Sequence, residues 1–112
     1  MTTRLTYVIQ FVEDMDAAVH FHRDVLGLPL KFQSPDWSEF ATGSTSLALH
    51  PASSTNPPGK IQLGFGVPDL QAFYKDMLAR GFTFTQPPTS EGQSKLARFI
   101  DADGIEYSVS GD

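Results

Sequence analysis

Residues 14–28, which read DMDAAVHFHRDVLGL, decide the fold of this chain. Asp14 and Asp16 are candidate N-caps, because an aspartate side chain accepts hydrogen bonds from the unpaired N–H groups of a first helical turn. Apolar side chains then recur at helical spacing, and Gly27 follows the last of them, as a glycine just past a helix does. We therefore predict a helix to about Leu26, with an apolar stripe formed by Ala18, Phe21, His22, Val25 and Leu26.

Strand-like segments lie on both sides of this helix. Residues 5–12 precede it and are rich in β-branched and aromatic side chains. A tight turn around Gly43 joins two of the three short strands that follow, which we predict at about 28–33, 36–42 and 45–50. Residues 51–59 are rich in proline and small polar side chains, which do not join a strand ladder, so we predict a linker there.

The same order of elements then begins again, as an internal repeat with a period of about 54 residues. We predict a strand at 61–67, then a helix opened by Asp69 with the stripe Leu70, Phe73, Tyr74, Met77 and Leu78. A strand begins at Phe82, a loop covers 87–94, and strands follow near 95–101 and 105–110. The expected fold class is α+β: one domain, residues 1–112, of two βαβββ modules (about 4–50 and 60–110). Their mixed sheets would curve around a cleft, with the helices outside.

Composition excludes several classes of protein. The chain has 112 residues, a formal net charge of −5 and no cysteine. The acidic balance argues against nucleic acid as a partner, since its binders carry a basic patch. Without cysteine there is no disulfide framework and no thiolate metal site. Apolar runs stay far below the ~18 residues that span a bilayer, so we expect no membrane partner and a cytoplasmic location.

The stretch 14–28 resembles the opening helix of the vicinal oxygen chelate superfamily, also called the glyoxalase/bleomycin-resistance/dioxygenase superfamily. The segments EFATG (39–43) and LALH (47–50) add to this resemblance, and DADG (101–104) is similar to the family's late D-P-D-G turn, with Ala102 in place of proline. The resemblance covers nearly the whole chain. It implies paired βαβββ modules, a cleft that binds a small molecule, and a homodimer.

Metal-dependent members of this family place histidine or glutamate at four strand positions, which the resemblance carries onto Tyr7, Ala48, Gln62 and Ser108. A divalent transition metal prefers imidazole, carboxylate or thiolate ligands. Alanine supplies no ligand, neutral serine and glutamine are weak ones, and tyrosine keeps its proton to about pH 10 in water. We therefore expect no metal, no other cofactor and no catalytic residue. The metal-free branch, similar to bleomycin-resistance proteins that sequester a small molecule, is favoured.

Strand alternation predicts which side chains line the cleft. Pairing across the Gly43 turn places Glu39 opposite Ala48 and Trp37 opposite His50, a wall suited to an aromatic or cationic ligand. The full set of expected ligand-binding residues is Tyr7, Ile9, Phe11, Trp37, Glu39, Ala48, His50, Gln62, Gly64, Glu106 and Ser108. Two alternatives stay open: a lyase of the glyoxalase type or a ring-cleaving dioxygenase with displaced metal ligands, and a non-catalytic interaction module.

Overall fold

The computed structural model describes residues 2–91 and 94–112 of the chain. These residues form two compact units. The first, here the N-terminal unit, comprises residues 6–62, and the second, the C-terminal unit, comprises residues 63–112 with the N-terminal residues up to 5. In the part of the chain that is described, no helix is long and apolar enough to cross a membrane.

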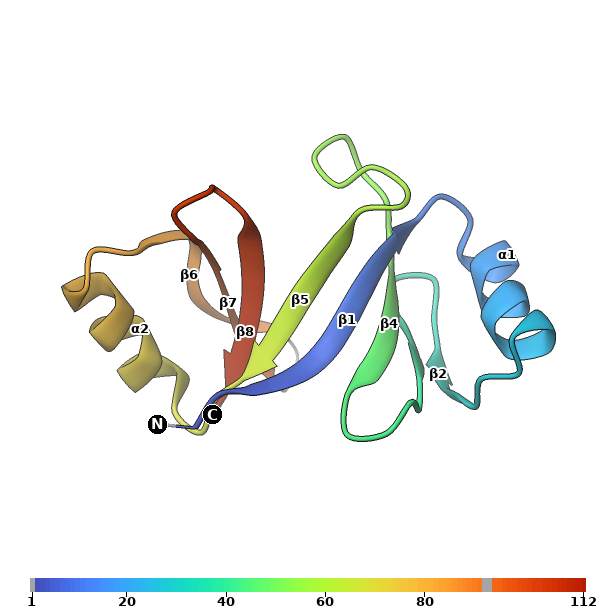
Figure 1. Ribbon diagram of the computed structural model, residues 1–112, viewed down its shortest axis with the longest axis horizontal. Coiled ribbons are helices and arrows are strands. Elements are labelled where there is room, and N and C mark those ends of the chain that lie inside the picture. Colours follow the sequence, from blue (N-terminus) through green and yellow to red (C-terminus); the bar gives the residue numbers. More distant parts are fainter. Residues whose placement is uncertain (1, 92–93) are drawn as a thin grey trace. The chain divides into compact units, whose positions relative to one another are not determined.

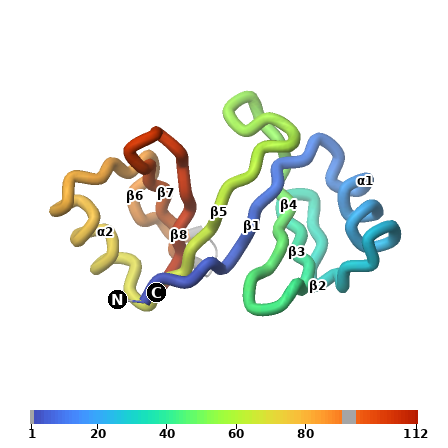
Figure 2. Tube along the Cα trace, viewed as in Figure 1, coloured from blue at the N-terminus to red at the C-terminus, as the bar shows by residue number. Residues whose placement is uncertain are grey.

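The N-terminal unit is built on a four-stranded sheet with the strand order β2-β3-β4-β1. β1 and β4 pair in parallel, and the other neighbours are antiparallel. Figure 1 shows α1 on one side of these strands, and Figure 2 shows β3 between β2 and β4. The elements are β1 (Arg4–Val12), α1 (Met15–His20), the π-helical turn η1 (Phe21–Val25), β2 (Leu30–Gln33), β3 (Ser38–Phe40) and β4 (Ser46–Pro51).

The first helix begins where the sequence predicts and then departs from the expected pattern. Asp14, not Asp16, is the N-cap, and its Oδ1 accepts from the backbone N–H of Ala17 at 3.0 Å. After His20 the helix widens into a π-turn, in which the N–H of Leu26 donates to the carbonyl of Phe21 at 3.0 Å. A π-turn closes an i→i+5 bond, so it shifts the residues after it out of phase with a 3.6-residue period.

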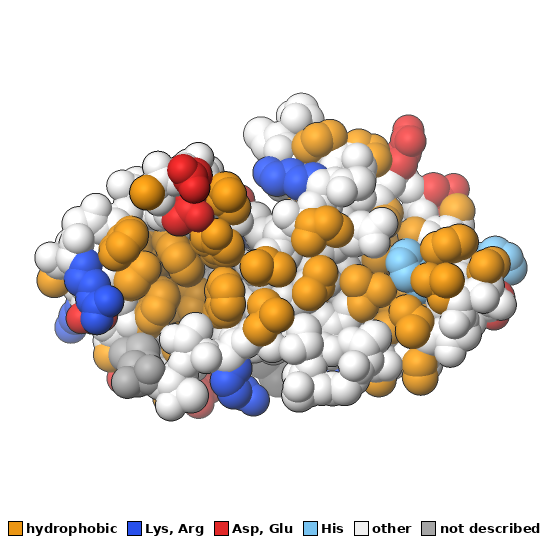
Figure 3. Space-filling view, viewed as in Figure 1, with side chains coloured by type: hydrophobic (Ala, Val, Ile, Leu, Met, Phe, Trp, Pro, Cys, Tyr) orange, Lys and Arg blue, Asp and Glu red, His pale blue; other side chains and the backbone are white. Residues whose placement is uncertain are grey.

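The apolar stripe predicted for this helix is therefore wrong at three positions. Phe21, Val25 and Leu26 are 48%, 62% and 55% exposed, and Figure 3 shows hydrophobic side chains at the surface of this segment beside histidine side chains. The face that packs on the sheet is instead formed by Met15, Ala18, Val19 and His22. These four residues also have helical i, i+3, i+4, i+7 spacing, so the sequence carried two overlapping stripes.

The core of the N-terminal unit lies between this helix and the sheet. It consists of buried Val12, Val19, Phe40 and Leu49. His22 is buried beside them, with its ring 5.5 Å from that of Phe40 and its Nδ1 2.7 Å from the carbonyl oxygen of Ala18. Because a carbonyl oxygen only accepts, this Nδ1 donates, and the buried imidazole has a hydrogen-bond partner.

The C-terminal unit repeats the same plan with the strand order β5-β8-β7-β6. β5 and β8 pair in parallel, and Asp69 caps the helix by accepting from the N–H of Ala72 at 3.0 Å. Its core is made by Val67, Leu70, Ala97 and Val109, with several phenylalanines packed against it. The elements are β5 (Ile61–Gly66), α2 (Leu70–Ala79), β6 (Thr83–Glu91), β7 (Ser94–Ile100) and β8 (Glu106–Gly111). The α+β class with two βαβββ modules is thus confirmed.

The loop predicted over residues 87–94 is wrong for most of its length. β6 continues to Glu91 and β7 begins at Ser94, while residues 92–93 lie outside the described part of the chain. Pro87 and Pro88 are tolerated because β6 is the edge strand of its unit and its register with β7 shifts between Gln86 and Thr89. Proline lacks an N–H to donate, so within sheets it is confined to such edges and bulges.

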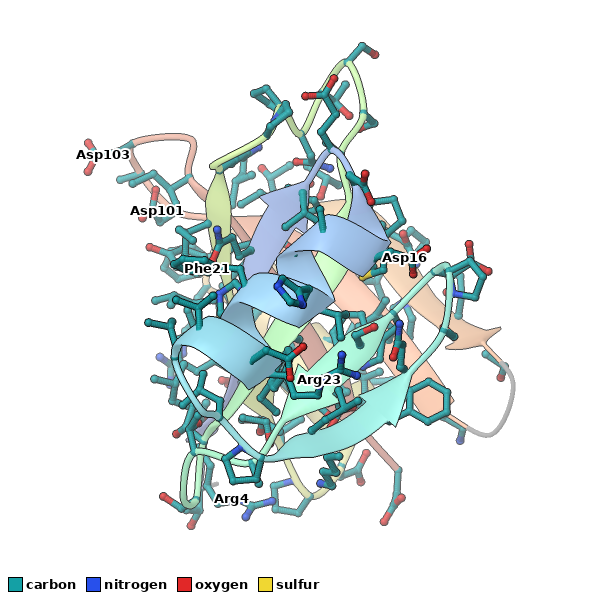
Figure 4. The ribbon with its side chains drawn as sticks, turned by 90° about the vertical axis from the view of Figure 1, so that its right-hand side faces the viewer. Arg4, Asp16, Phe21, Arg23, Asp101 and Asp103 are labelled. Atoms are coloured by element: carbon teal, nitrogen blue, oxygen red, sulfur yellow. The ribbon has the colours of Figure 1, made fainter. Side chains whose placement is uncertain are left out.

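The turn between β7 and β8 is organised by one carboxylate. Asp101 Oδ1 accepts from the N–H groups of Asp103 at 2.9 Å and Ile105 at 3.0 Å, and Oδ2 accepts from the Tyr107 hydroxyl at 2.8 Å. Figure 4 shows Asp101 and Asp103 at this turn. The Tyr107 hydroxyl, followed by the backbone N–H groups, lowers the pKa of Asp101, and the same hydrogen bond raises the pKa of Tyr107.

We expect the Tyr107→Phe substitution to make the folded protein less stable at acid pH, because it removes a hydrogen bond to the Asp101 carboxylate. A carboxyl whose pKa is lowered on folding contributes stability that is present above its unfolded pKa, about 3.9, and is lost as the pH falls through the folded pKa. Removing the hydroxyl should therefore raise the pKa of Asp101, which a carbon-13 NMR titration of the carboxyl group measures. Tyr74→Phe, in α2, is the matched control. An Asp101 titration that is identical in both variants would contradict this account.

Candidate functional site

The face of the N-terminal sheet that α1 does not cover carries a second apolar cluster. Buried Ile9, Phe11 and Ala48 form its base, and Tyr7, Trp37 and Ala52 pack against it. The predicted pairing of Glu39 with Ala48 is present, and the neighbouring pair is Ser38 with Leu49. Trp37 lies just before β3, outside the ladder, and meets His50 through its ring. Leu49 belongs to the core under α1, so Glu39 and Ala48 occupy the opposite face.

Three rings join that of Phe11 on this face, and we call the four together the aromatic wall: Tyr7, Phe11, Trp37 and His50. The Tyr7 and Trp37 rings are 5.4 Å apart at 87°, and the Trp37 and His50 rings are 6.3 Å apart at 83°. The Phe11 ring lies 5.3 Å from that of His50. Such edge-to-face contacts add about 0.5–1.5 kcal/mol each beyond the burial of area, so the rings hold one another in place.

Glu39 is the carboxylate of the aromatic wall. Its side chain is only 15% exposed, and Oε1 accepts from Trp37 Nε1 at 2.8 Å. Lys31 Nζ lies 3.7 Å from Oε2 but is itself mostly exposed. The indole N–H therefore fixes the orientation of both the carboxylate and the Trp37 ring, while the flexible lysine forms a long and weak ion pair.

Tyr7 and His50 supply the other polar atoms of the wall. Burial raises the pKa of Tyr7, and the charge of Glu39 and a hydrogen bond to it raise this pKa further. The phenol therefore keeps its proton at neutral pH and donates to Glu39. His50 Nδ1 lies 2.9 Å from the carbonyl oxygen of Pro51; this nitrogen donates, which leaves Nε2 as an acceptor in the neutral ring.

The four positions that the family resemblance assigns to metal ligands do not suit a divalent metal. Ala48 is fully buried and offers a methyl group, while Gln62 and Ser108 are buried neutral side chains. Tyr7 keeps its proton for the reasons given above. Among the described residues, no group of three or more His, Cys, Asp or Glu side chains is gathered as an ion would require. The donor set thus does not fit a transition-metal centre.

The remaining predicted residues divide between the units. Gln62 is buried at the end of the N-terminal unit, whereas Gly64 and Ser108 pair with each other in the C-terminal sheet. Glu106 also lies in β8, and its Oε2 accepts from the Thr85 hydroxyl at 2.7 Å. Seven of the predicted residues come together in the N-terminal unit: Tyr7, Ile9, Phe11, Trp37, Glu39, Ala48 and His50.

Two charged residues near these positions had no place in the predicted set. Lys31 reaches Glu39 from β2, and Arg98 pairs with Ser108 in the strand ladder. Strand pairing could have indicated both, had β2 been placed in register with β3 and β7 with β8. A surface pocket at the start of α1 contains none of the predicted residues and is lined by Glu13, Asp14, Met15, Asp16 and Pro35. Figure 4 labels Asp16, which is one of these residues.

Solved structures of low sequence identity share this fold. Streptomyces coelicolor methylmalonyl-CoA epimerase, solved with 2-nitronate-propionyl-CoA, matches with a TM-score of 0.81 and 17% identity, covering 100% of this chain and 99% of that chain. The Mycobacterium tuberculosis methylmalonyl-CoA epimerase matches with a TM-score of 0.80 and 22% identity, covering 96% and 86%. A hypothetical protein from Bacillus halodurans, BH1468, gives 0.79 and 14%, covering 100% and 96%.

Sequence comparison finds closer but uncharacterised relatives. The protein YurT of Bacillus subtilis (strain 168) is 32% identical over 111 residues, which covers 84% of this chain and 87% of YurT. An uncharacterised Mycolicibacterium smegmatis protein is 29% identical over 100 residues, covering 87% and 84%. The family model described as Glyoxalase/Bleomycin resistance protein/Dioxygenase superfamily matches residues 4–109. The chain therefore belongs to the glyoxalase/bleomycin resistance protein/dioxygenase superfamily.

Proposed function

We propose that this protein binds a small organic molecule with an aromatic or cationic group on the aromatic wall, and that it does so without a divalent metal ion. The observation that carries this proposal is the pairing of Trp37 with Glu39, in which one hydrogen bond of 2.8 Å holds a flat ring beside a mostly buried carboxylate. Apolar surface with a few fixed polar groups is what small-molecule sites require.

The chemistry of the wall selects the class of ligand. A cation near the face of a tryptophan gains about 0.5–2 kcal/mol, and a planar ring gains from stacking on the same surface. The Glu39 carboxylate adds an attraction that is strengthened by its burial. A ligand that carries both a ring and a positive charge uses all of these groups, so we favour aromatic ammonium compounds over neutral aromatic ones.

The biological role that follows is sequestration of such a compound, as in the bleomycin-resistance proteins that the sequence resembles. We further propose that the protein acts in the cytoplasm as a homodimer. Light scattering coupled to gel filtration tests the dimer, because one chain has a mass of 12.3 kDa. A monomeric mass at all accessible concentrations would contradict this part of the proposal.

Fluorescence tests the binding proposal, because Trp37 is the only tryptophan in the chain. We expect aromatic ammonium compounds to change its emission in a saturable manner, and neutral alcohols with the same ring system to bind more weakly. Glu39→Gln should weaken ammonium binding by about 10- to 100-fold, since a hydrogen bond or contact to a charged group contributes about 1.5–3 kcal/mol.

The matched control removes a carboxylate from outside the wall. Glu13→Gln carries the same change in charge at an exposed residue and should leave the affinity unchanged. Far-UV circular dichroism checks that both variants are folded. If a broad panel of cationic and neutral aromatic compounds never changes Trp37 emission, or if both variants weaken binding equally, the aromatic wall is not the binding site.

A further inference from the structure

Arg98 lies on the face of the C-terminal sheet that α2 does not cover. Its neighbours in β7 show this, because Ala97 is part of the core of this unit and Phe99 packs against that core. Side chains alternate between the two faces along a strand. The guanidinium group of Arg98 therefore projects from the opposite face of the sheet.

Strand pairing places Arg98 in a row of residues that crosses the whole C-terminal sheet. Gln86 of β6 pairs with Arg98, Arg98 pairs with Ser108 of β8, and Ser108 pairs with Gly64 of β5. We call these four residues the Arg98 row. Arg98 Nη1 donates to Gln86 Oε1, which confirms that both side chains are on the same face. Gly64 adds no side chain to its end of the row.

Among the described residues, no ion pair joins a carboxylate to Arg98. Its side chain is nevertheless partly buried. A guanidinium carries five N–H donors in a rigid fork that matches the two oxygens of a carboxylate. Gln86 accepts from one of these donors, so the Arg98 row can still receive an anionic group.

Glu106 limits the negative charge that a ligand bound at the Arg98 row can carry. It lies in β8 two residues before Ser108, on the same face of the strand. Because Arg98 pairs with Ser108, Glu106 is a diagonal neighbour of Arg98 in the strand ladder, and its carboxylate repels each further negative charge on a ligand. A monoanionic carboxylate therefore suits the Arg98 row better than a dianionic phosphate.

The internal repeat supports a role in binding for this position. In the N-terminal sheet the corresponding row consists of Phe32, Glu39, Ala48 and Ile9, again one residue from each strand. Arg98, second in the row from the edge strand of its sheet, therefore corresponds to Glu39, second from the edge strand of the other sheet. The two modules present opposite charges at equivalent places on their uncovered faces, where most strand residues are apolar or small.

We propose that Arg98, assisted by the Gln86 amide and the Ser108 hydroxyl, binds the carboxylate group of a small organic acid. This site is built from residues of the C-terminal unit, and it goes beyond the proposed function of the aromatic wall. Its success or failure is independent of the Trp37 experiment, because no residue of the wall takes part in it.

Nitrogen-15 NMR of the whole chain tests the proposal with sodium acetate and inorganic phosphate as probes, at pH 8 and at an ionic strength held constant with sodium chloride. We expect acetate to shift the Nε–H signal of Arg98 and the amide signal of Ser108 in a saturable manner, with phosphate binding more weakly. Arg98→Gln should weaken acetate binding at least about tenfold, given the strength of charge-assisted hydrogen bonds.

Two further variants separate binding by the Arg98 guanidinium group from a general effect of positive charge. Lys95→Gln removes one positive charge from an exposed residue of the same strand and should leave acetate binding unchanged. Arg98→Lys retains the charge but loses the fork, so its affinity should lie between those of the wild type and Arg98→Gln. Shifts that do not saturate, equal losses in Arg98→Gln and Lys95→Gln, or tighter binding of phosphate than of acetate would each overturn the proposal.

Discussion

Replacing Phe40 by alanine is expected to lower the free energy of unfolding by about 3–5 kcal/mol, the range measured for phenylalanine in protein cores. Phe40 is fully buried between α1 and the sheet, in one cluster with Val12, Val19 and Leu49. Its ring also contacts the buried imidazole of His22 at a centroid distance of 5.5 Å. Domains are stable by only about 5–15 kcal/mol, so this one substitution removes a large share.

Urea unfolding followed by circular dichroism measures this effect, and Phe32→Ala is the matched control. Phe32 lies in the neighbouring strand β2 but is 53% exposed, so its loss should change stability by no more than about 0.5 kcal/mol. Similar losses for the two variants would show that the core is not where the structure places it.

The C-terminal unit allows the same comparison within one helix. Leu70→Ala is expected to destabilise the protein by about 2–5 kcal/mol, because Leu70 is fully buried at the start of α2 and packs with Val67, Ala97 and Val109. Leu78, eight residues later in α2, is 46% exposed, so the apolar stripe predicted for this helix is wrong at this position. Leu78→Ala should cost less than about 0.5 kcal/mol. If Leu78→Ala were the more damaging variant, the orientation of α2 would be wrong.

Much of the fold follows from short-range sequence signals: helix caps, turn glycines and strand alternation. Aspartates at 14 and 69 cap the two helices, and glycines at 27, 43 and 104 adopt positive φ angles at turns that the sequence predicts. Strand alternation placed Glu39 opposite Ala48, because a hairpin turn fixes its register. The aromatic cluster was thereby predictable, although its role in binding remains a prediction.

The errors arose where tertiary packing overrides local pattern. Phe21 is more hydrophobic than Val19, yet Val19 is buried and Phe21 exposed, because the helix turns a different face to the sheet and then widens into a π-turn. The Pro87-Pro88 pair suggested a loop, but an edge strand does not need their N–H groups. Neither the phase of a short helix nor the position of an edge strand can be decided from the residues alone.

Contacts between distant residues were also beyond the sequence. Lys31 approaches Glu39 only because β2 pairs with β3 across an irregular register. Arg98 was absent from the predicted ligand-binding set, and its place in a row across four strands depends on three separate pairings. Such rows become visible only when every strand neighbour is known.

The most direct test of the account combines one titration with one elemental analysis. Untagged protein is dialysed against a chelator, its zinc, nickel, manganese and iron contents are measured, and Trp37 emission is followed with an aromatic ammonium compound. We predict substoichiometric metal before dialysis and the same saturable change in emission before and after it. A divalent metal bound at one ion per chain, whose removal abolishes the response of Trp37, would contradict the account.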